Sequence, residues 1–140
     1  MRIWKLNILL LLAIFLIGCA GTTQFQNYPN LDTRNTPTAM IHVIRSNSAF
    51  GSAITAPVFI DRYRIGNIGP GGYLKTRVPV GRVSVTSTTA DVIVQTEKGK
   101  QYFIEIDMPV QGWMYSPDFN ASAVDRQRAI EVLGFDPSER

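Results

Sequence analysis

The stretch Tyr102-Phe103-Ile104-Glu105-Ile106-Asp107 alternates apolar with acidic side chains. In an extended chain, successive side chains point to opposite sides, so Tyr102, Ile104 and Ile106 share one face, while Glu105 and Asp107 lie on the other. This period of two predicts a strand with one buried and one solvated face.

Further short apolar runs flank this strand along the chain. They cover residues 40–44, 58–60, 64–65, 82–86, 92–94 and 119–124. Glycine and proline turn signals separate them, at 66, 69–72, 79–81 and 98–100. Strands of this length at spacings of about 8–12 residues are typical of an antiparallel sandwich or barrel. We therefore expect a mainly β fold, a small antiparallel β-sandwich.

A short C-terminal helix is expected to follow the strands, over residues 125–133. Asp125 is a suitable N-cap, Ile130 and Leu133 would form the buried stripe, and Gly134 would end the helix.

The N-terminus has the pattern of an export signal. Two basic residues, Arg2 and Lys5, precede the uninterrupted apolar run 8–17. A helix that spans a membrane needs about 20 apolar residues, so this run is typical of a cleaved signal peptide.

Residues 16–19, Leu-Ile-Gly-Cys, resemble the bacterial lipobox. The resemblance implies cleavage before Cys19, which would carry an S-diacylglycerol group and an N-acyl chain such as palmitate. The alternative is an unmodified cysteine.

Composition narrows the possible functions. One Cys and one His exclude a disulfide framework and the usual zinc sites. Loss of residues 1–18 would leave 12 basic against 11 acidic residues, which gives no charge footprint for nucleic acid.

By resemblance to Gram-negative lipoproteins, Ala20 after the cysteine favours the outer membrane, facing the periplasm.

Three segments follow from this organisation. Residues 1–18 form the signal peptide, 19–38 the acylated cysteine and a flexible tether, and 39–140 the sandwich domain with its helix. Residues 21–37 are rich in Thr, Asn and Pro and lack apolar periodicity, which favours a tether. Phe25, Tyr28 and Leu31 leave an ordered N-terminal strand as the alternative.

Several motifs together resemble one family. They are Phe-Gly-Ser-Ala at 50–53, Val-x-Ile-Asp at 58–61, Ile-Gly-x-Ile at 65–68, Gly-Tyr at 72–73, Val-Pro-x-Gly at 78–81 and Gly-Lys-x-Tyr-Phe at 99–103. The chain resembles the bacterial lipoprotein family described as domain of unknown function 2846 over residues 39–133. It has a weaker likeness to PEGA-type β-sandwich modules. The resemblance implies a transthyretin- or immunoglobulin-like sandwich on a lipid anchor, and no catalytic residues.

Two positions depart from that family pattern. Arg62 follows Asp61 where the family often has Asp-Gly, so this turn must be of another type or strained. Val83 stands where the family often has His.

Residues with chemical potential have simpler interpretations. His42 lies within an apolar run without a second His, so a packed strand histidine is favoured over a ligand. The glycine-rich stretch 66–72 lacks the Lys-Ser/Thr of a phosphate-binding loop. We expect no cofactor and no metal.

One loop is a candidate interaction surface. Residues 111–119 place Trp113, Tyr115 and Phe119 beside Gly and Pro. Aromatic residues dominate binding hot spots, and loops often carry recognition. Alternatively, these side chains close one end of the core.

The expected function is that of a membrane-anchored, non-catalytic envelope lipoprotein that binds another envelope component and has no nucleic-acid partner. A first alternative is a cell-wall hydrolase, because six carboxylates could converge in space: Asp61, Glu97, Glu105, Asp107, Asp118 and Asp125. A second is a structural envelope lipoprotein.

Overall fold

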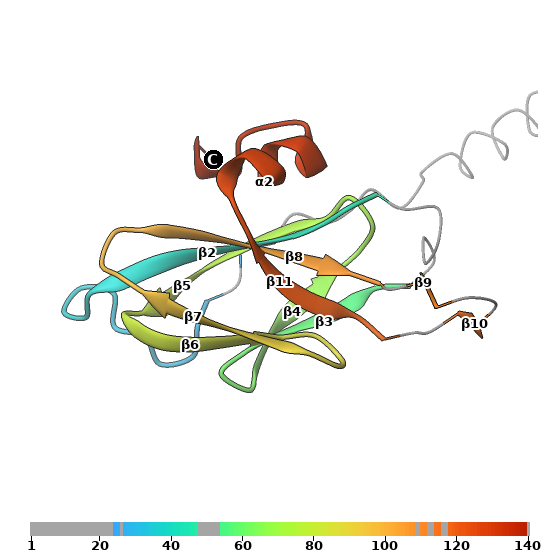
Figure 1. Cartoon of the computed structure of the whole chain (residues 1–140). Coiled ribbons are helices and arrows are strands. Elements are labelled where there is room, and N and C mark those ends of the chain that lie inside the picture. The colour runs from blue at the N-terminus through green and yellow to red at the C-terminus, as the bar shows by residue number, and fades with distance from the viewer. Residues whose placement is uncertain are drawn as a thin grey trace, which may run out of the picture.

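Two β-sheets pack face to face, and one short helix covers part of the larger sheet (Figure 1). This computed structural model describes residues 24–25, 27–47, 54–108, 110–111, 114–115 and 118–139. The predicted β-sandwich with a C-terminal helix is confirmed.

The larger sheet has five strands, in the spatial order β1 (Gln24–Phe25), β5 (Tyr73–Pro79), β2 (Thr38–Arg45), β8 (Gln101–Asp107) and β11 (Asn120–Val124). The smaller has four, in the order β4 (Tyr63–Ile68), β3 (Ala56–Ile60), β6 (Gly81–Thr86) and β7 (Asp91–Thr96). A separate pair joins β9 (Val110–Gln111) and β10 (Met114–Tyr115). Helix α2 (Arg126–Leu133) and the 3-10 helix η1 (Pro137–Glu139) follow β11.

Most strand pairs are antiparallel, as predicted, but two in the larger sheet are parallel. β2 pairs with β8 in parallel, with His42 opposite Phe103, and β1 pairs with β5. Between β2 and β8 the chain forms β3 and β4 in the smaller sheet, β5 in the larger, and β6 and β7 in the smaller again. It returns to the larger sheet in the direction of β2, which makes the central pair parallel.

The main core lies between the sheets. Ile41 and Val43 of β2 and Ile104 and Ile106 of β8 are fully buried there, against valines and isoleucines of the smaller sheet. Complete burial of one such side chain stabilises a fold by about 1.5–3 kcal/mol. The inward faces predicted for β8 and for Val83 and Val85 of β6 are confirmed.

A second, smaller core lies between α2 and the opposite face of the larger sheet. It contains Ile44, Tyr73, Phe103 and Ala129. The predicted caps are confirmed: Asp125 accepts a hydrogen bond from the Arg128 amide, and Gly134 has a φ of 75°. The predicted stripe differs, since Ala129 is the buried residue of the helix. A small side chain at this point lets the helix approach the sheet closely.

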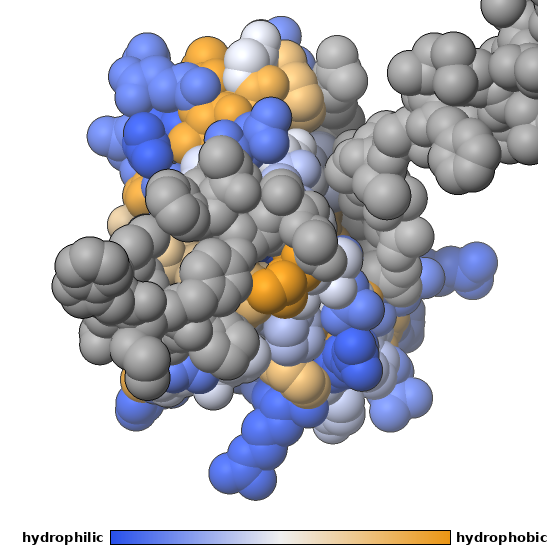
Figure 2. Space-filling view, turned by 90° about the vertical axis from the view of Figure 1, so that its right-hand side faces the viewer, coloured by the Kyte–Doolittle hydropathy of each residue, from blue (hydrophilic) through white to orange (hydrophobic). Residues whose placement is uncertain are grey.

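Apolar side chains at the margin of this second core stay partly exposed. They are Val124, Val132, Leu133 and Phe135. Figure 2 shows hydrophobic residues gathered at the top of the view, at the height of α2 in Figure 1. None of the helices in the described part of the chain is long and apolar enough to cross a membrane.

The segment before β2 packs on the sandwich where a flexible tether was expected. β1 pairs with β5 at the edge of the larger sheet. The Tyr28 hydroxyl donates to Asp61 Oδ2 at 3.0 Å, and the Thr36 amide donates to the Asp32 carbonyl at 3.0 Å. The alternative of an ordered N-terminal strand is met at Gln24–Phe25, and the turn that follows is joined to the β3–β4 turn through Tyr28.

Candidate functional site

The outward face of the larger sheet is half covered. On this face, residues paired across β5, β2 and β8 form three rows. The first row is Tyr73, Ile44 and Glu105, the second is Lys75, His42 and Phe103, and the third is Arg77, Met40 and Gln101. Helix α2 lies over the first of these rows, where Ile44 and Tyr73 belong to the second core. The last row borders an open groove.

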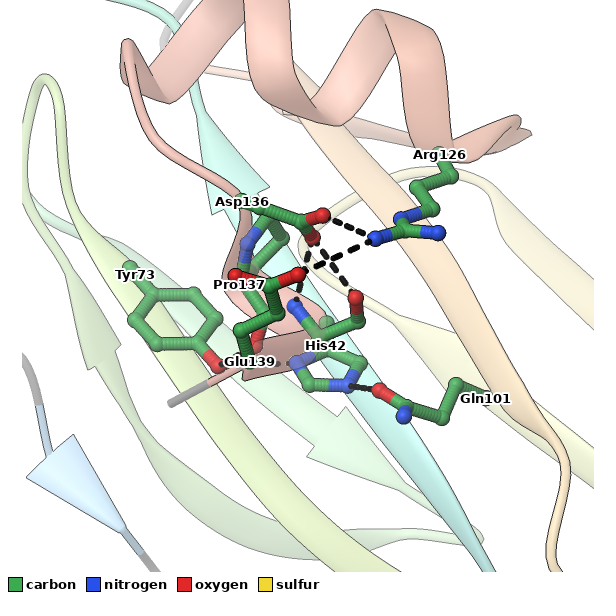
Figure 3. A network of polar contacts seen from close by, with 8 residues as sticks. His42, Tyr73, Gln101, Arg126, Asp136, Pro137 and Glu139 are labelled. Carbon is green, nitrogen blue, oxygen red and sulfur yellow. Dashed lines mark hydrogen bonds and ion pairs between the residues drawn. The ribbon is translucent and has the colours of Figure 1, made fainter.

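His42 stands at the boundary between the two halves and is 1% exposed. Its Nδ1 lies 2.8 Å from the Tyr73 hydroxyl, which donates its own hydrogen to the Pro137 carbonyl at 3.1 Å. A neutral imidazole has a single N–H, which donates either from Nδ1 to Tyr73 or from Nε2 to Gln101 Oε1. Nε2 lies 2.6 Å from Gln101 Oε1, and the ring stacks on Phe103 with centroids 5.0 Å apart. Figure 3 shows the imidazole between Tyr73 and Gln101.

Burial lowers the pKa of His42 below its ordinary value of 6.5. The hydrogen bond to Gln101 opposes this shift, the positive charge of Lys75 adds to it, and the charge of Asp136 opposes it. Because burial is the largest effect, the ring is neutral at pH 7. The interpretation of His42 as a packed strand residue fits its contacts, although its burial is more complete than expected.

An ion pair fixes η1 above His42. Arg126 Nη2 contacts Asp136 Oδ2, and Asp136 Oδ1 accepts hydrogen bonds from the Ser138 amide at 3.0 Å and from the Ser138 hydroxyl at 2.6 Å (Figure 3). These bonds hold the pKa of Asp136 well below its usual range. The carbonyl of Pro137 is thereby placed to accept the Tyr73 hydroxyl.

The open half of the face forms a groove of about 750 Å³. Met40 and His42 line it from β2, and Thr33 and Asn35 line it from the segment before that strand. Its five basic residues come from three parts of the chain. Arg34 belongs to the segment before β2, Lys75 and Arg77 belong to β5, and Lys98 and Lys100 belong to the β7–β8 turn. We call these five the basic groove. Among the described residues that line it, none is acidic.

Few carboxylates neutralise this charge. Lys100 Nζ lies 2.7 Å from Glu97 Oε2, an exposed pair that raises the pKa of Lys100. Within the described part of the chain, no ion pair joins Arg34, Arg77 or Lys98 to a carboxylate. Asp32 borders an adjoining hollow of about 910 Å³ that shares Lys75 and Arg77.

The predicted interaction loop is only partly described. Trp113 lies outside the described residues, as does Cys19, and Tyr115 belongs to β10. Phe119 is 1% exposed and packs in the main core, with the Arg45 guanidinium 4.8 Å from its ring centre. The proposal of Phe119 as a contact residue is corrected accordingly: its side chain closes the end of the core.

The contacts of four of the six candidate carboxylates are structural. Glu105 accepts two hydrogen bonds from Arg128, Glu97 pairs with Lys100, Asp125 caps α2, and Asp61 accepts from Tyr28 and Ser84. Glu105 and Asp125 both contact Arg128, but the four carboxylates do not form one cluster among the described residues.

A different carboxylate pair gathers around Ser84. The Ser84 amide donates to Asp61 Oδ1 at 2.9 Å, and the Ser84 hydroxyl donates to Asp91 Oδ2 at 3.3 Å. Asp61, Ser84 and Asp91 line an open hollow of about 690 Å³ on the outward face of the smaller sheet. Arg62 and Arg82 line the same hollow.

Sequence reasoning missed two features. Arg45 ends an apolar strand and is 4% exposed, with Nη1 donating to the carbonyls of Ile54 at 2.6 Å and Ile68 at 3.1 Å. The basic groove was missed because its residues are scattered. The alternation of Lys75 and Arg77 was the available signal, but only strand pairing brings them beside the β7–β8 turn.

Comparison of the chain with the models of known protein families, with curated proteins and with solved structures found no match.

Proposed function

We propose that this chain is a bacterial envelope lipoprotein, anchored through acylated Cys19, whose sandwich domain is a non-catalytic binding module for another envelope component. The observation that carries the proposal is the lipobox-like Leu-Ile-Gly-Cys at 16–19, placed directly after the apolar run 8–17 and containing the chain's single Cys. The resemblance to domain of unknown function 2846 points the same way.

The position of β1 adds to this proposal. Gln24, the first residue of β1, follows Cys19 by five residues. A fully extended chain of that length spans at most about 17 Å. An acylated Cys19 would thus keep the β1 edge of the larger sheet close to the bilayer surface, rather than on a long tether.

The anchor is tested with Cys19→Ser in the native host. Wild-type protein should incorporate a fatty-acid label and sediment with membranes, whereas Cys19→Ser should lose the label and keep its signal peptide. Ala20→Ser serves as the matched control and should behave as wild type. Continued labelling of Cys19→Ser would refute the lipoprotein proposal.

The expected outer-membrane location has its own test. Asp directly after the acylated cysteine is the residue associated with retention at the inner membrane in Gram-negative lipoproteins. Ala20→Asp should therefore shift the protein from outer- to inner-membrane fractions. An unchanged distribution would contradict the location proposed here.

The partner surface is proposed to include Trp113 and Tyr115. A photoreactive residue placed at either position should give one dominant protein adduct in intact cells. The same residue at exposed Arg82, on the smaller sheet, is the control and should not give that adduct. Equal adducts from both places would remove the loop from the proposal.

The hydrolase alternative is supported by one arrangement, Asp61 and Asp91 on either side of Ser84. Its geometry favours structure over catalysis, because Asp61 already accepts hydrogen bonds from Tyr28 and Ser84. If the protein were a hydrolase, purified wild type would release fragments from cell-wall sacculi and Asp91→Asn would not. We expect release from neither. A structural role without a ligand is the remaining alternative.

A further inference from the structure

The basic groove concentrates positive charge on a chain that is almost neutral. Without residues 1–18 the chain has 12 basic and 11 acidic residues, and five of the 12 line this one groove. They come from segments far apart in sequence, so folding alone brings them together. A surface lined by charge of one sign raises the local concentration of ions of the other sign.

The side chains that line the groove are of the kinds that bind an anion with several oxygens. Arg34 lies on the segment before β2, Arg77 on β5 and Lys98 on the β7–β8 turn, so the cations come from three separate segments of the chain. Guanidinium and ammonium groups are the side chains that bind phosphate most strongly. Neutral donors that line the same groove, Thr33 and Asn35 among them, can satisfy the remaining oxygens.

Three cations of the groove, Arg34, Arg77 and Lys98, form no ion pair with a carboxylate in the described part of the chain. Glu97 is engaged with Lys100 at its rim, and Asp136 is engaged with Arg126 and Ser138. Glu139 lies 3.8 Å from Arg126, and Asp32 is a further carboxylate nearby. It accepts hydrogen bonds from the Asn35 side chain at 2.9 Å and the Arg34 amide at 3.0 Å, and these bonds lower its pKa. It borders the adjoining hollow and not the groove itself.

The groove belongs to the sheet edge that leads to the anchor. Lys75 is the partner of Phe25 in the pairing of β5 with β1. If Cys19 is acylated, the groove lies within a short chain length of the bilayer, where lipid phosphates are abundant.

From the groove's charge and composition, we propose that it binds a phosphate group, carried by a lipid headgroup or by a soluble phosphate compound. This inference rests on the proposed role as a binding module but does not need the lipid anchor. Arg34, Arg77 and Lys98 supply the cations, and His42 lies at the floor as a neutral residue.

His42 supplies a built-in reporter of this site. It is the only histidine of the chain, so its ring gives a single, unambiguous set of NMR signals. It lines the groove and is held in place by Tyr73 and Gln101. A phosphate bound above it should shift these signals and raise the pKa of the ring, since a nearby negative charge favours the protonated form.

The experiment uses the purified mature protein in micelles of a maltoside detergent, which carries no phosphate. In one arm inorganic phosphate is titrated in, and in the other phosphatidylglycerol is added to the micelles. The double variant Arg77→Glu/Lys98→Glu should weaken the response of His42 by about tenfold or more, since each hydrogen bond to a charged group is strong. Arg82→Glu, a single charge reversal on the smaller sheet, is the control and should leave the response of His42 unchanged.

Each outcome decides the inference. A response to inorganic phosphate that the double variant loses supports a site for soluble phosphates. A response to phosphatidylglycerol alone, again lost in the double variant, supports a lipid headgroup. No response in either arm, or an equal loss in Arg82→Glu, overturns the inference. Association of the wild type and of the double variant with separate phosphatidylcholine vesicles reports the anchor, so a failed anchor and a failed groove give different results.

Discussion

The turn between β3 and β4 shows how one residue type strains a hairpin. Asp61 and Arg62 have φ values of 47° and 74°, so both central residues are left-handed, the geometry of a type I′ turn. Glycine adopts this region freely, whereas a residue with a Cβ is strained there. From the sequence, either another turn type or backbone strain was expected at this turn, and the structure shows strain at Arg62.

Arg62→Gly should therefore stabilise the protein. Relief of the left-handed backbone should exceed the entropy that glycine adds to the unfolded chain, for a net gain of about 0.5–1 kcal/mol. Urea unfolding measures the change. Arg64→Gly, two residues later inside β4, is the control and should destabilise. A loss of stability in Arg62→Gly would contradict the account of this turn.

His42 makes stability depend on pH. Its pKa in the folded protein is lowered by burial, so the unfolded chain binds a proton more readily. Stability is complete above the unfolded pKa of about 6.5 and falls as the pH drops below it, at up to about 1.4 kcal/mol per pH unit.

The variant His42→Gln should remove this dependence. It loses hydrogen bonds and so starts less stable, but its urea midpoint should change little between pH 7.5 and 5.5, where wild type should lose stability. These two pH values bracket the ordinary histidine pKa of about 6.5. Parallel losses in wild type and variant would show that another group causes the dependence.

At the scale of elements, α2 is fastened to the sheet by one bidentate contact. Arg128 Nε and Nη2 each lie 2.9 Å from the oxygens of Glu105 on β8, and the Glu105 side chain is nearly buried. Arg128 itself is about half exposed, so water weakens the pair.

Arg128→Ala should destabilise the protein by about 1–2 kcal/mol, because it leaves the Glu105 carboxylate without its donors. Arg128→Lys should recover only part of this stability, because an ammonium group can donate to Glu105 but cannot make both hydrogen bonds. Gln127→Ala, at an exposed position of the same helix, is the control. If Arg128→Ala unfolds at the same urea concentration as that control, the contact contributes nothing.

The sequence predicted those elements whose patterns are local. The inward faces of β8 and β6 and the caps Asp125 and Gly134 depend only on neighbouring residues, and the structure has them as predicted. The outward face of β8 was expected to be solvated, but Phe103 and Glu105 are buried there because α2 lies over them. β5 escaped prediction because Thr76 is the inward residue between Leu74 and Val78, while outward Tyr73 is buried by α2. A polar inward residue and an apolar outward one together mask the period of two.

Pairing between distant strands could not be predicted in the same way. The parallel contact of β2 with β8 joins His42 to Phe103, and nothing in either strand specifies the partner. The basic groove depends on this arrangement, so its residues were individually visible but their convergence was not. The interaction loop, by contrast, was inferred from composition alone, and Phe119 proved to be a core residue.

At the scale of the whole molecule, the helix and the groove divide one sheet face. Helix α2 seals the apolar half, and the basic residues gather on the other half, next to the strand that leads to the N-terminus. Net charge conceals this asymmetry, because acidic residues elsewhere on the surface balance the groove. The proposed anchor and the proposed phosphate site would therefore act on the same side of the domain.

The measurement that tests the central claim most directly is the mass of the N-terminal peptide of the protein purified from its native host. The account predicts a mature chain that begins at Cys19 and carries a diacylglyceryl group on sulfur and an acyl chain on nitrogen. A chain that still begins at Met1, or one with an unmodified Cys19, would contradict it.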